Sequence, residues 1–549
     1  MPSVIFDKPI NKFRVWFLPS VFLSLLLYMS LFTAKCSSGD IIHPKNVILI
    51  TLDTQRSDSI GAYCPDNART PNIDSIAENG ILFENCYSPI PITLPAHASL
   101  FYSLAPHELN LYNNGQVFRN EKKLVSLAQK FKIKGKRTAG FVSLGVLKSK
   151  FRLNDGFDQY IDDHPEQRWY LRAEEINERA FPWIDENHNN PFFLWLHYSD
   201  PHDPYAPPSV PPDVKIFFNG RHYKDLCFQH EEHLFLPFLL EKGKNTIEFI
   251  VVNPYPDLRD EFRVSLNDVG YNGIPDFRIE YEDMNVVQRN SRTSLLIKES
   301  GLIIIDNPEK ETSFLLDATG VIYLLPDEKI DGYRKEVEYL DQQIGRLVAK
   351  LEQQALLTNT MIVLLGDHGE GLGGHRTRLG EPHFGHIHFL YNEYLKIPLI
   401  ISNPLLKEKG LKKKDPATIL DIAPTILGMM GWPKLSFHKG IDLLNKKNDR
   451  KRYILGETYR PESTKDRFSV IAYPWHLIFS PADSGYKLYN LANDSEEKEN
   501  IYEKEKLNPD IVEMQKKLKA TAVQILLRKK DVKLDADSLE MLRSLGYIE

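Results

Sequence analysis

Three continuous apolar runs stand out in the pattern of hydrophobic and polar positions, at residues 45–51, 191–197 and 360–366. Short continuous apolar runs predict strands that are covered on both faces, as in a parallel sheet. Helical patterns lie between these runs, at residues 124–131, 174–184 and 333–354. Strands that alternate with helices predict an α/β sandwich.

The pattern changes between about residues 211 and 329. Period-two alternation with Asn-Gly and Gly turns replaces the continuous runs, at residues 214–218, 246–252, 262–266 and 277–281. This patterning predicts antiparallel β structure, which we interpret as an inserted β-sandwich. The insert could select a carbohydrate or another substrate, or it could be structural or oligomerising. The structural role is slightly favoured, because the sequence places no aromatic platform.

A smaller α+β region is predicted after about residue 405. Asp421 begins a helix with a proline near its first turn, and residues 487–491 predict a last strand. Residues 511–529 form a Lys-rich amphipathic helix, for which a solvated face is favoured over a membrane patch. The predicted organisation is an N-terminal segment (1–39), a catalytic domain in two parts (40–210 and 330–404), the insert (211–329) and the C-terminal region (405–549).

The N-terminal 39 residues have the layout of an export signal. Lys8, Lys12 and Arg14 precede an uncharged run at 15–34, and small residues follow it. We therefore expect a periplasmic or cell-surface protein. About 20 uncharged residues also suffice for one membrane-spanning helix, and Cys36 allows a lipoprotein, although Lys35 departs from the usual small residue. A cleaved signal, a membrane anchor and a lipoprotein stay open as alternatives.

Composition and charge exclude several classes of function. The 549 residues include 68 Lys and Arg against 74 Asp and Glu, a formal net charge of −6. No global positive field is present to hold a polyanion, so nucleic acid is not an expected partner. The four cysteines are scattered and give neither a disulfide framework nor a paired cysteine zinc site.

Residue types that bind metal ions gather in four segments, at 53–58, 91–100, 197–205 and 367–388. Any one of them alone is a weak signal, but three of them follow the apolar runs directly. The carboxyl ends of parallel strands are where α/β folds gather their chemistry. Asp367 and His368 at one strand end can bind a divalent ion, and Asp53 from another strand completes a shared site.

Thr93 is the candidate nucleophile. It lies between two prolines in a turn that leads into a helix start, whose free N–H groups would cradle an anion. A metal ion beside a hydroxyl lowers the pKa of that hydroxyl and stabilises the oxyanions of a phosphoryl or sulfuryl group. The alternative is that Thr93 is simply the N-cap of the helix.

The chain resembles the sulfatase family within the alkaline phosphatase superfamily, in ordered matches over nearly all of its length outside the insert. The matching stretches are 53–58, 70–74, 80–83, 93–100, 197–205, 367–370, 372–375, 390–391, 396–400, 487–491 and 542–547. The resemblance implies an alkaline-phosphatase-like α/β sandwich and an ester hydrolase. It also implies one divalent metal ion held by Asp53, Asp367 and His368, with the nucleophile Thr93 beside it.

Three further positions take their expected roles from this resemblance. His97 stands where sulfatases carry an arginine of the nucleophile motif. His202 and His386 resemble residues that bind the anion or protonate the leaving group. Thr54 replaces the second Asp of the usual sulfatase pair, and His368 replaces the usual Asn. The imidazole shifts the expected preference from calcium toward zinc or manganese, with calcium still open.

The sequence departs from the family at the nucleophile. Sulfatases place Cys or Ser at the position of Thr93 and convert it to formylglycine, which threonine cannot form by the known route. Cys86 does not replace it, because the proline and arginine of the motif are missing at the required offsets. A formylglycine hydrate releases sulfate by elimination, whereas a sulfated threonine has no such exit. Thr93 therefore favours phosphate or phosphonate esters, while the overall resemblance favours sulfate esters.

Several alternatives remain at this stage. One metal ion is preferred, although Asp200, His202 and His386 could hold a second one. Hydrolysis of a small-molecule, glycan or lipid ester is the first hypothesis. A phospho-headgroup or glycan transferase could use the same site, and a non-catalytic glycan-binding protein could use the same scaffold. The oligomeric state is not predicted.

Overall fold

The computed structural model describes most of the chain after residue 42. The described residues are 43–164, 169–203, 205, 214–226, 232–251, 261–266, 278–282, 285–289, 292–297, 300–307, 312–321, 326–377, 380–445, 451–459, 466–481 and 485–528. The export-like segment at 1–39 and the closing motif at 542–547 lie outside them. Within the described residues, no helix has the length and apolar character needed to cross a membrane.

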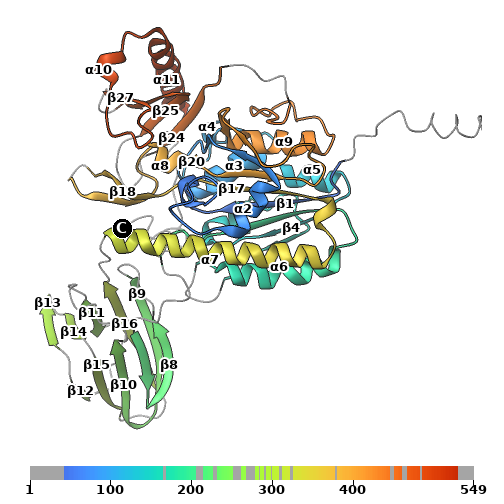
Figure 1. Ribbon diagram of the computed structural model, residues 1–549. Coiled ribbons are helices and arrows are strands. Elements are labelled where there is room, and N and C mark those ends of the chain that lie inside the picture. Colours follow the sequence, from blue (N-terminus) through green and yellow to red (C-terminus); the bar gives the residue numbers. More distant parts are fainter. Residues whose placement is uncertain are drawn as a thin grey trace, which may run out of the picture. The chain divides into compact units, whose positions relative to one another are not determined.

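An eight-stranded mixed sheet forms the middle layer of the catalytic body (Figure 1). Its strands, in spatial order, are β22 (Leu411–Lys413), β2 (Gly80–Phe83), β21 (Leu399–Ser402), β17 (Thr360–Gly366), β1 (Asn46–Leu52), β6 (Phe192–Tyr198), β4 (Arg137–Phe141) and β5 (Gln159–Ile161). The five strands from β17 to β5 are parallel, and β21 is antiparallel to β17. The three apolar runs therefore form the neighbouring parallel strands β17, β1 and β6.

Helices cover both faces of this sheet (Figure 1). One face packs against α2 (Pro71–Glu78), α6 (Ala173–Asn187) and α7 (Pro326–Gln353), and the other against α3 (Thr93–Tyr102), α5 (Leu127–Ile133) and α9 (Ile422–Met429). Successive residues of β1 point to opposite faces, so Val47 and Leu49 join one core while Ile48 and Ile50 join the other. Because both faces are buried, β1 reads as a continuous apolar run.

Two predicted helices have different boundaries in the structure. The pattern at 124–131 becomes α5, which begins only at Leu127 because Ser126 caps it. The Ser126 hydroxyl accepts the N–H of Gln129 at 3.0 Å, and the Gln129 side chain accepts the N–H of Ser126 at 2.9 Å. The pattern at 333–354 becomes α7, which begins at Pro326, a residue type that suits a first helical turn.

The region of alternating sequence forms two antiparallel sheets. One contains β12 (Arg278–Glu282), β15 (Ser300–Asn307), β10 (Gly243–Val251), β7 (Val214–Phe218) and β8 (Arg221–Leu226), and the other β13 (Asn285–Arg289), β14 (Arg292–Ile297), β11 (Glu261–Leu266), β16 (Thr312–Val321) and β9 (Glu232–Leu240). Asn219 and Gly220, with φ of 48° and 73°, join β7 to β8 in the tight turn that this dipeptide predicts.

The C-terminal region contains a four-stranded antiparallel sheet and a long helix. The sheet consists of β24 (Ile454–Thr458), β25 (Arg467–Ala472), β26 (Trp475–Ser480) and β27 (Gly485–Asn490). The helix α11 (Pro509–Arg528) follows the short α10 (Tyr502–Glu505) and buries Ile511, Met514 and Leu518 in the main core. The fold class is thus the predicted one: an α/β sandwich with inserted β structure and a C-terminal α+β region.

Short elements complete the described structure. They are α4 (Pro106–Leu109), α8 (Asn392–Leu395), the paired strands β18 (Gly371–Arg376) and β19 (Pro382–Gly385), the strands β20 (Lys396–Ile397), β3 (Cys86–Tyr87) and β23 (Ala417–Thr418), and five 3-10 turns at 57–59, 145–147, 149–151, 357–359 and 419–421. The β18–β19 pair leads into the loop that carries His386. This loop is important for the site described next.

Candidate metal centre and active site

The register of the central strands brings the two predicted aspartates together. Leu52 at the end of β1 pairs with Gly366 at the end of β17, so Asp53 and Asp367 leave the sheet side by side. The backbone N–H of Asp367 donates to the carbonyl of Leu52 at 3.2 Å, and that of Asp53 donates to Tyr198 at 2.8 Å. The ends of β1, β17 and β6 therefore form one edge where polar side chains can meet.

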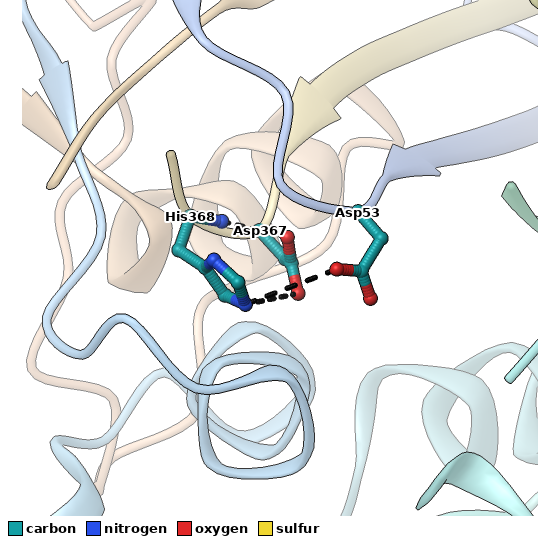
Figure 2. Close-up of side chains that lie close together, drawn as sticks. All are labelled: Asp53, Asp367 and His368. Carbon is teal, nitrogen blue, oxygen red and sulfur yellow. Dashed lines mark hydrogen bonds and ion pairs between the residues drawn. The ribbon is translucent and has the colours of Figure 1, made fainter. Parts of the chain in front are cut away.

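Asp53, Asp367 and His368 converge at this edge (Figure 2). Each offers one ligand atom, and these atoms all lie within 4.8 Å of one another. The Nε2 atom of His368 is 3.4 Å from Oδ2 of Asp367 and 3.9 Å from Oδ1 of Asp53. Across the described part of the chain, this is the only group of three or more such residues that could hold a metal ion. The structure thus brings together the three residues predicted as ligands.

The electrostatics of these residues suit a bound cation. Burial raises the pKa of the Asp367 carboxyl well above its ordinary value, and the charge of Asp53 adds to this shift. Burial acts in the same direction on Asp53, but the hydrogen bond from His197 and the nearby His202 and His368 bring its pKa well below the ordinary value. Neither Oδ1 of Asp53 nor Oδ2 of Asp367 accepts a hydrogen bond from a described residue. Two buried carboxylates in this state favour a divalent ion between them.

His368 is suited to ligation by its protonation state. Burial lowers its pKa to about 3, which keeps the imidazole neutral near pH 7, as a metal ligand must be. Its Nδ1 lies 3.0 Å from the carbonyl of Gly369, which accepts a hydrogen bond when Nδ1 carries the proton. That bond leaves Nε2 facing the two aspartates, the arrangement that holds histidine ligands in metal sites.

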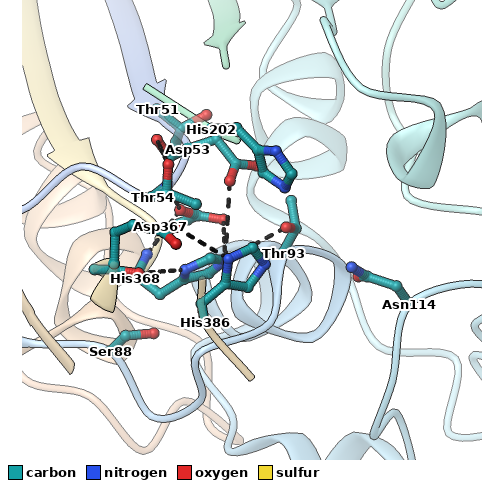
Figure 3. A network of polar contacts seen from close by, with 12 residues as sticks. Thr51, Asp53, Thr54, Ser88, Thr93, Asn114, His202, Asp367, His368 and His386 are labelled. Atoms are coloured by element: carbon teal, nitrogen blue, oxygen red, sulfur yellow. Dashed lines mark hydrogen bonds and ion pairs between the residues drawn. The ribbon is translucent and has the colours of Figure 1, made fainter. Parts of the chain in front are cut away.

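The hydroxyl of Thr93 lies beside these donors (Figure 3). Its Oγ1 is 3.4 Å from Nε2 of His368. Thr93 is the first residue of α3, and the N-cap is Ile92, whose extended backbone makes no side-chain cap. The interpretation of Thr93 as a simple N-cap is therefore wrong. Instead, Asn114 accepts the N–H of Leu94 at 2.9 Å through its Oδ1 atom.

His97 lies one turn further along α3 and is fully buried. Its Nδ1 donates to the carbonyl of Thr93 at 2.8 Å, and its Nε2 lies 3.1 Å from the hydroxyl of Thr51. Thr51 accepts the indole N–H of Trp195 at 2.9 Å, so its own proton is available for Nε2 of His97. Burial lowers the pKa of His97 to about 3. This geometry gives His97 a neutral ring that holds the start of α3, in contrast to a charged arginine.

The other two predicted histidines also lie beside the donors (Figure 3). The ring of His386 lies 4.5 Å from that of His368 and 5.1 Å from that of His202, measured between centroids. Nδ1 of His386 is 3.1 Å from Oε2 of Glu370, and the hydroxyl of Tyr205 donates to Oε1 of Glu370 at 3.0 Å. Burial lowers the pKa of His386 to about 3 and raises the pKa of Glu370 well above its ordinary value.

The structure does not assemble the alternative second metal site. Asp200 accepts the backbone N–H of Ala173 at 3.0 Å, at the start of α6. Burial raises its pKa to about 7. Within the described residues, Asp200, His202 and His386 do not form a further converging group. Asp200 therefore supports the neighbouring helix and does not extend the donor cluster.

Several polar residues at the site received no role from the sequence. His197 Nε2 is 3.3 Å from Oδ2 of Asp53, and its Nδ1 is 2.7 Å from the hydroxyl of Ser143. Its place at the end of a predicted strand was a usable signal. Glu370 belongs to the segment 367–388 that the sequence singled out, although without a role, whereas Ser143 and Asn114 gave no signal of their own. The Nδ2 atom of Asn114 is buried and bonds to no described residue, on the side of Thr93 in Figure 3.

The fold is an alkaline-phosphatase-like α/β sandwich, and the comparison with known proteins defines its family. The Sulfatase family matches residues 45–432, and the family described as N-sulphoglucosamine sulphohydrolase, C-terminal, matches residues 380–524. Since the first match spans more than half of the chain, the chain belongs to the sulfatase family and is an ester hydrolase of that family. The predicted family resemblance is confirmed.

Individual relatives are distant but cover most of the chain. An N-acetylglucosamine-6-O-sulfatase of Bacteroides thetaiotaomicron is 24% identical over 524 residues, which are 88% of each chain. Human iduronate 2-sulfatase is 23% identical over 501 residues, which are 78% of each chain. A protein solved with its substrate D-glucosamine-2-N,6-O-disulfate has a TM-score of 0.58 at 18% identity and covers 89% of this chain and 100% of its own.

A second kind of neighbour differs in its chemistry. The phosphonate monoester hydrolase of Agrobacterium radiobacter has a TM-score of 0.55 at 15% identity. The match covers 88% of this chain and 96% of that one. At these identities the structural neighbours show the fold alone, and they place sulfate and phosphonate hydrolases on the same architecture.

Proposed function

We propose that this protein hydrolyses phosphate or phosphonate esters, with Thr93 as the nucleophile and one divalent ion on Asp53, Asp367 and His368. The observation that carries the proposal is the Thr93 hydroxyl, 3.4 Å from Nε2 of His368 and beside two buried carboxylates. Zinc or manganese suits a set of two carboxylates and one imidazole. When bound, such an ion lowers the pKa of a nearby hydroxyl and stabilises anionic oxygens.

The proposed reaction has two displacement steps. The Thr93 hydroxyl loses its proton to solvent, and Oγ1 forms a bond to phosphorus as the bond to the ester oxygen breaks. His386 gives a proton to the leaving alkoxide, with His202 as the alternative donor. Water then attacks the phosphorus of the phosphothreonine and gives one proton to His386, while the bond between phosphorus and Oγ1 breaks. The released Oγ1 takes back a proton from solvent.

The surrounding residues support this assignment of roles. Glu370 holds Nδ1 of His386 at 3.1 Å, which leaves Nε2 for the proton transfer, and an anionic ester beside the ring favours its protonated form. Nδ2 of Asn114 can donate to an oxygen of the bound ester. His97 keeps the start of α3 in place through the carbonyl of Thr93.

The second candidate function is hydrolysis of sulfate esters, which the family relationship favours. The relative from Bacteroides thetaiotaomicron is named as an N-acetylglucosamine-6-O-sulfatase, and another solved neighbour holds a neocarrahexaose. A sulfated threonine must be attacked at sulfur by water, because it lacks the second hydroxyl of a formylglycine hydrate. We further propose a sugar-borne ester as the substrate and export, on the basis of the N-terminal pattern, as the route to it.

The test compares ester classes with one metal ion at a time. The full chain is assayed with zinc, manganese or calcium on the 4-nitrophenyl esters of sulfate, phosphate and phenylphosphonate, and on bis(4-nitrophenyl) phosphate. We expect turnover of phosphorus esters that Thr93→Ala removes. Ser99→Ala is the matched control, because Ser99 is a buried hydroxyl of the same helix that bonds to no described residue. Faster turnover of the sulfate ester would favour the second candidate. No turnover of any ester, in a protein that also binds no metal, would favour a binding protein.

A further inference from the structure

The loop that carries His386 has a strained backbone. Ile387 has a φ of 80°, a conformation that β-branched residues rarely adopt. The N–H of His388 donates to the carbonyl of His386 at 3.0 Å, two residues back. A bond from residue i to residue i+2 around a positive φ defines the rare, strained form of the γ-turn. Glycine would adopt this φ most easily, but the residue at this position is isoleucine.

The C-terminal sheet holds this turn in place. The hydroxyl of Thr458, the last residue of β24, donates to the carbonyl of Ile387 at 2.7 Å. The guanidinium of Arg467, the first residue of β25, donates to the carbonyl of His388. Thr458 is fully buried, and Ile387 packs against the main core. Strained backbones persist where the surrounding structure over-determines them, and these contacts supply that restraint.

The turn decides where the ring of His386 lies. With Ile387 in this conformation, the ring sits 4.5 Å from that of His368, and its Nδ1 lies 3.1 Å from Oε2 of Glu370. If Ile387 relaxed to a negative φ, the backbone on either side of it would turn and carry the ring away from both. From the C-terminal sheet, Thr458 holds the carbonyl of Ile387 itself and Arg467 holds the next carbonyl, that of His388, and both contacts oppose this relaxation.

We infer that Thr458 is a positioning residue, through which the C-terminal sheet sets the ring of His386 for proton transfer to the leaving group. This inference rests on the role proposed for His386 above. A merely structural Thr458 would affect stability and slow all substrates alike. A positioning Thr458 affects only substrates that need a proton on the leaving group, because good leaving groups depart without one.

The test measures how each variant depends on the leaving group. Thr458→Val keeps the shape of the side chain and removes the hydroxyl. For the ester class that the enzyme hydrolyses, we expect it to lower kcat about tenfold on the phenyl ester and less than about twofold on the 4-nitrophenyl ester. Thr458→Ser should restore both values. Thr360→Val is the matched control. It also removes a buried hydroxyl that donates to a backbone carbonyl, here that of Leu356, but Thr360 is the first residue of β17 and lies at the end of the strand away from Asp367.

A second variant tests the strain itself. Glycine accepts a positive φ without steric cost, so Ile387→Gly should rescue the phenyl-ester activity of Thr458→Val. In a crystal structure of Thr458→Val, we expect Ile387 to leave the positive-φ region and His386 to move away from Glu370. Equal slowing of both esters, no rescue by glycine, or an unchanged turn would each overturn the inference.

The role of His386 is tested separately. If His386→Ala slows both esters equally, the role proposed for His386 fails. The crystal structure of Thr458→Val then still decides whether Thr458 sets the position of the ring. If His386→Ala is selective for the phenyl ester while Thr458→Val is not, the proposed role stands and the inference alone is overturned.

Discussion

The candidate metal ligands (Asp53, Asp367 and His368) lie next to the loop that carries His386, yet the two regions are held in place by different interactions. Asp53 and Asp367 follow two paired strands, whose hydrogen-bonded register fixes the point where each chain leaves the sheet. His386 lies on a loop whose backbone is strained and whose position depends on Glu370 and Thr458. A backbone ladder tolerates side-chain changes nearby, whereas a strained loop depends on a few specific contacts.

This difference suggests a division of labour within the site. The ligand cluster must keep close to one geometry in all states, which suits the buried centre of a sheet. His386, which we propose to protonate the leaving group, must fit a particular substrate, and such residues are often carried by loops. We therefore expect variants at strand ends to abolish function and variants of the loop to change its selectivity.

The largest effect is expected from Asp367→Asn, which removes a negative ligand at a strand end. Activity should fall by about 10⁴-fold, because the groups of a catalytic site act as a unit and the loss of one removes most of the effect of the others. The stabilisation by added zinc or manganese should also vanish, about 2.7 kcal/mol at a metal concentration of one hundred times Kd. Thermal unfolding with metal and with chelator measures this term.

The same variant should be more stable than the parent protein in chelator, because it relieves the repulsion between two buried carboxylates. Asp185→Asn is the control, since Asp185 is an exposed carboxylate on α6. Metal-dependent stabilisation that survives in Asp367→Asn would show that the ion binds elsewhere.

A smaller and selective effect is expected from His386→Ala in the loop. The loss of proton transfer should slow esters with poor leaving groups by about 10²-fold and leave 4-nitrophenyl esters nearly unchanged. Steady-state kinetics over a series of phenols of increasing pKa measures the slope. His188→Ala, at the C-terminal end of α6, should keep the slope of the parent protein. An unchanged slope in His386→Ala would place the proton donor elsewhere, with His202 as the next residue to test.

A still smaller effect is expected from Ser143→Ala, which tests how firmly the strand-end ligands are held. Ser143 fixes Nδ1 of His197, and Nε2 of His197 orients Asp53. Loss of such an outer contact should weaken metal affinity about tenfold, measured by titration with zinc or manganese. Ser469→Ala removes a buried hydroxyl with no partner among the described residues and should leave the affinity unchanged. Equal affinities in both variants would exclude His197 from the support of Asp53.

The smallest effect on function is expected at Asp200, after the third strand end, where only stability should change. Its pKa is raised to about 7 by burial, so the folded state binds a proton more tightly than the unfolded state. The stability that this proton contributes is complete below about pH 4 and is lost as the pH rises through 7. Asp200→Asn should reduce the change in the free energy of unfolding between pH 4 and pH 8 by about 2 kcal/mol. This is less than the pKa shift alone would give, because Asp200 is partly exposed. Urea unfolding from pH 4 to pH 8, with activity unchanged, checks this outcome.

Much of this architecture could be predicted from local patterns. The continuous apolar runs gave β1, β6 and β17, and the alternating stretches gave the antiparallel strands of the insert. Helix boundaries were less accurate, since the start of α5 depends on a cap that a periodicity does not show. The interpretation of Thr93 as an N-cap failed because α3 begins one residue earlier than a periodicity can fix: Thr93 is its first helical residue, and Ile92 is the N-cap.

The sequence by itself determined which strands carry the proposed ligands. Asp53 and Asp367 follow continuous apolar runs, and such runs form strands that are buried on both faces until the first polar residue. It also determined that the residue proposed as the nucleophile, Thr93, is a threonine hydroxyl and not a cysteine or serine. Only the tertiary structure decided the position of His386, through the contact between Ile387 and Thr458, which lie 71 residues apart. The physical reason is that a positive φ at an isoleucine opposes its local preference, so contacts from residues distant in the sequence must maintain it.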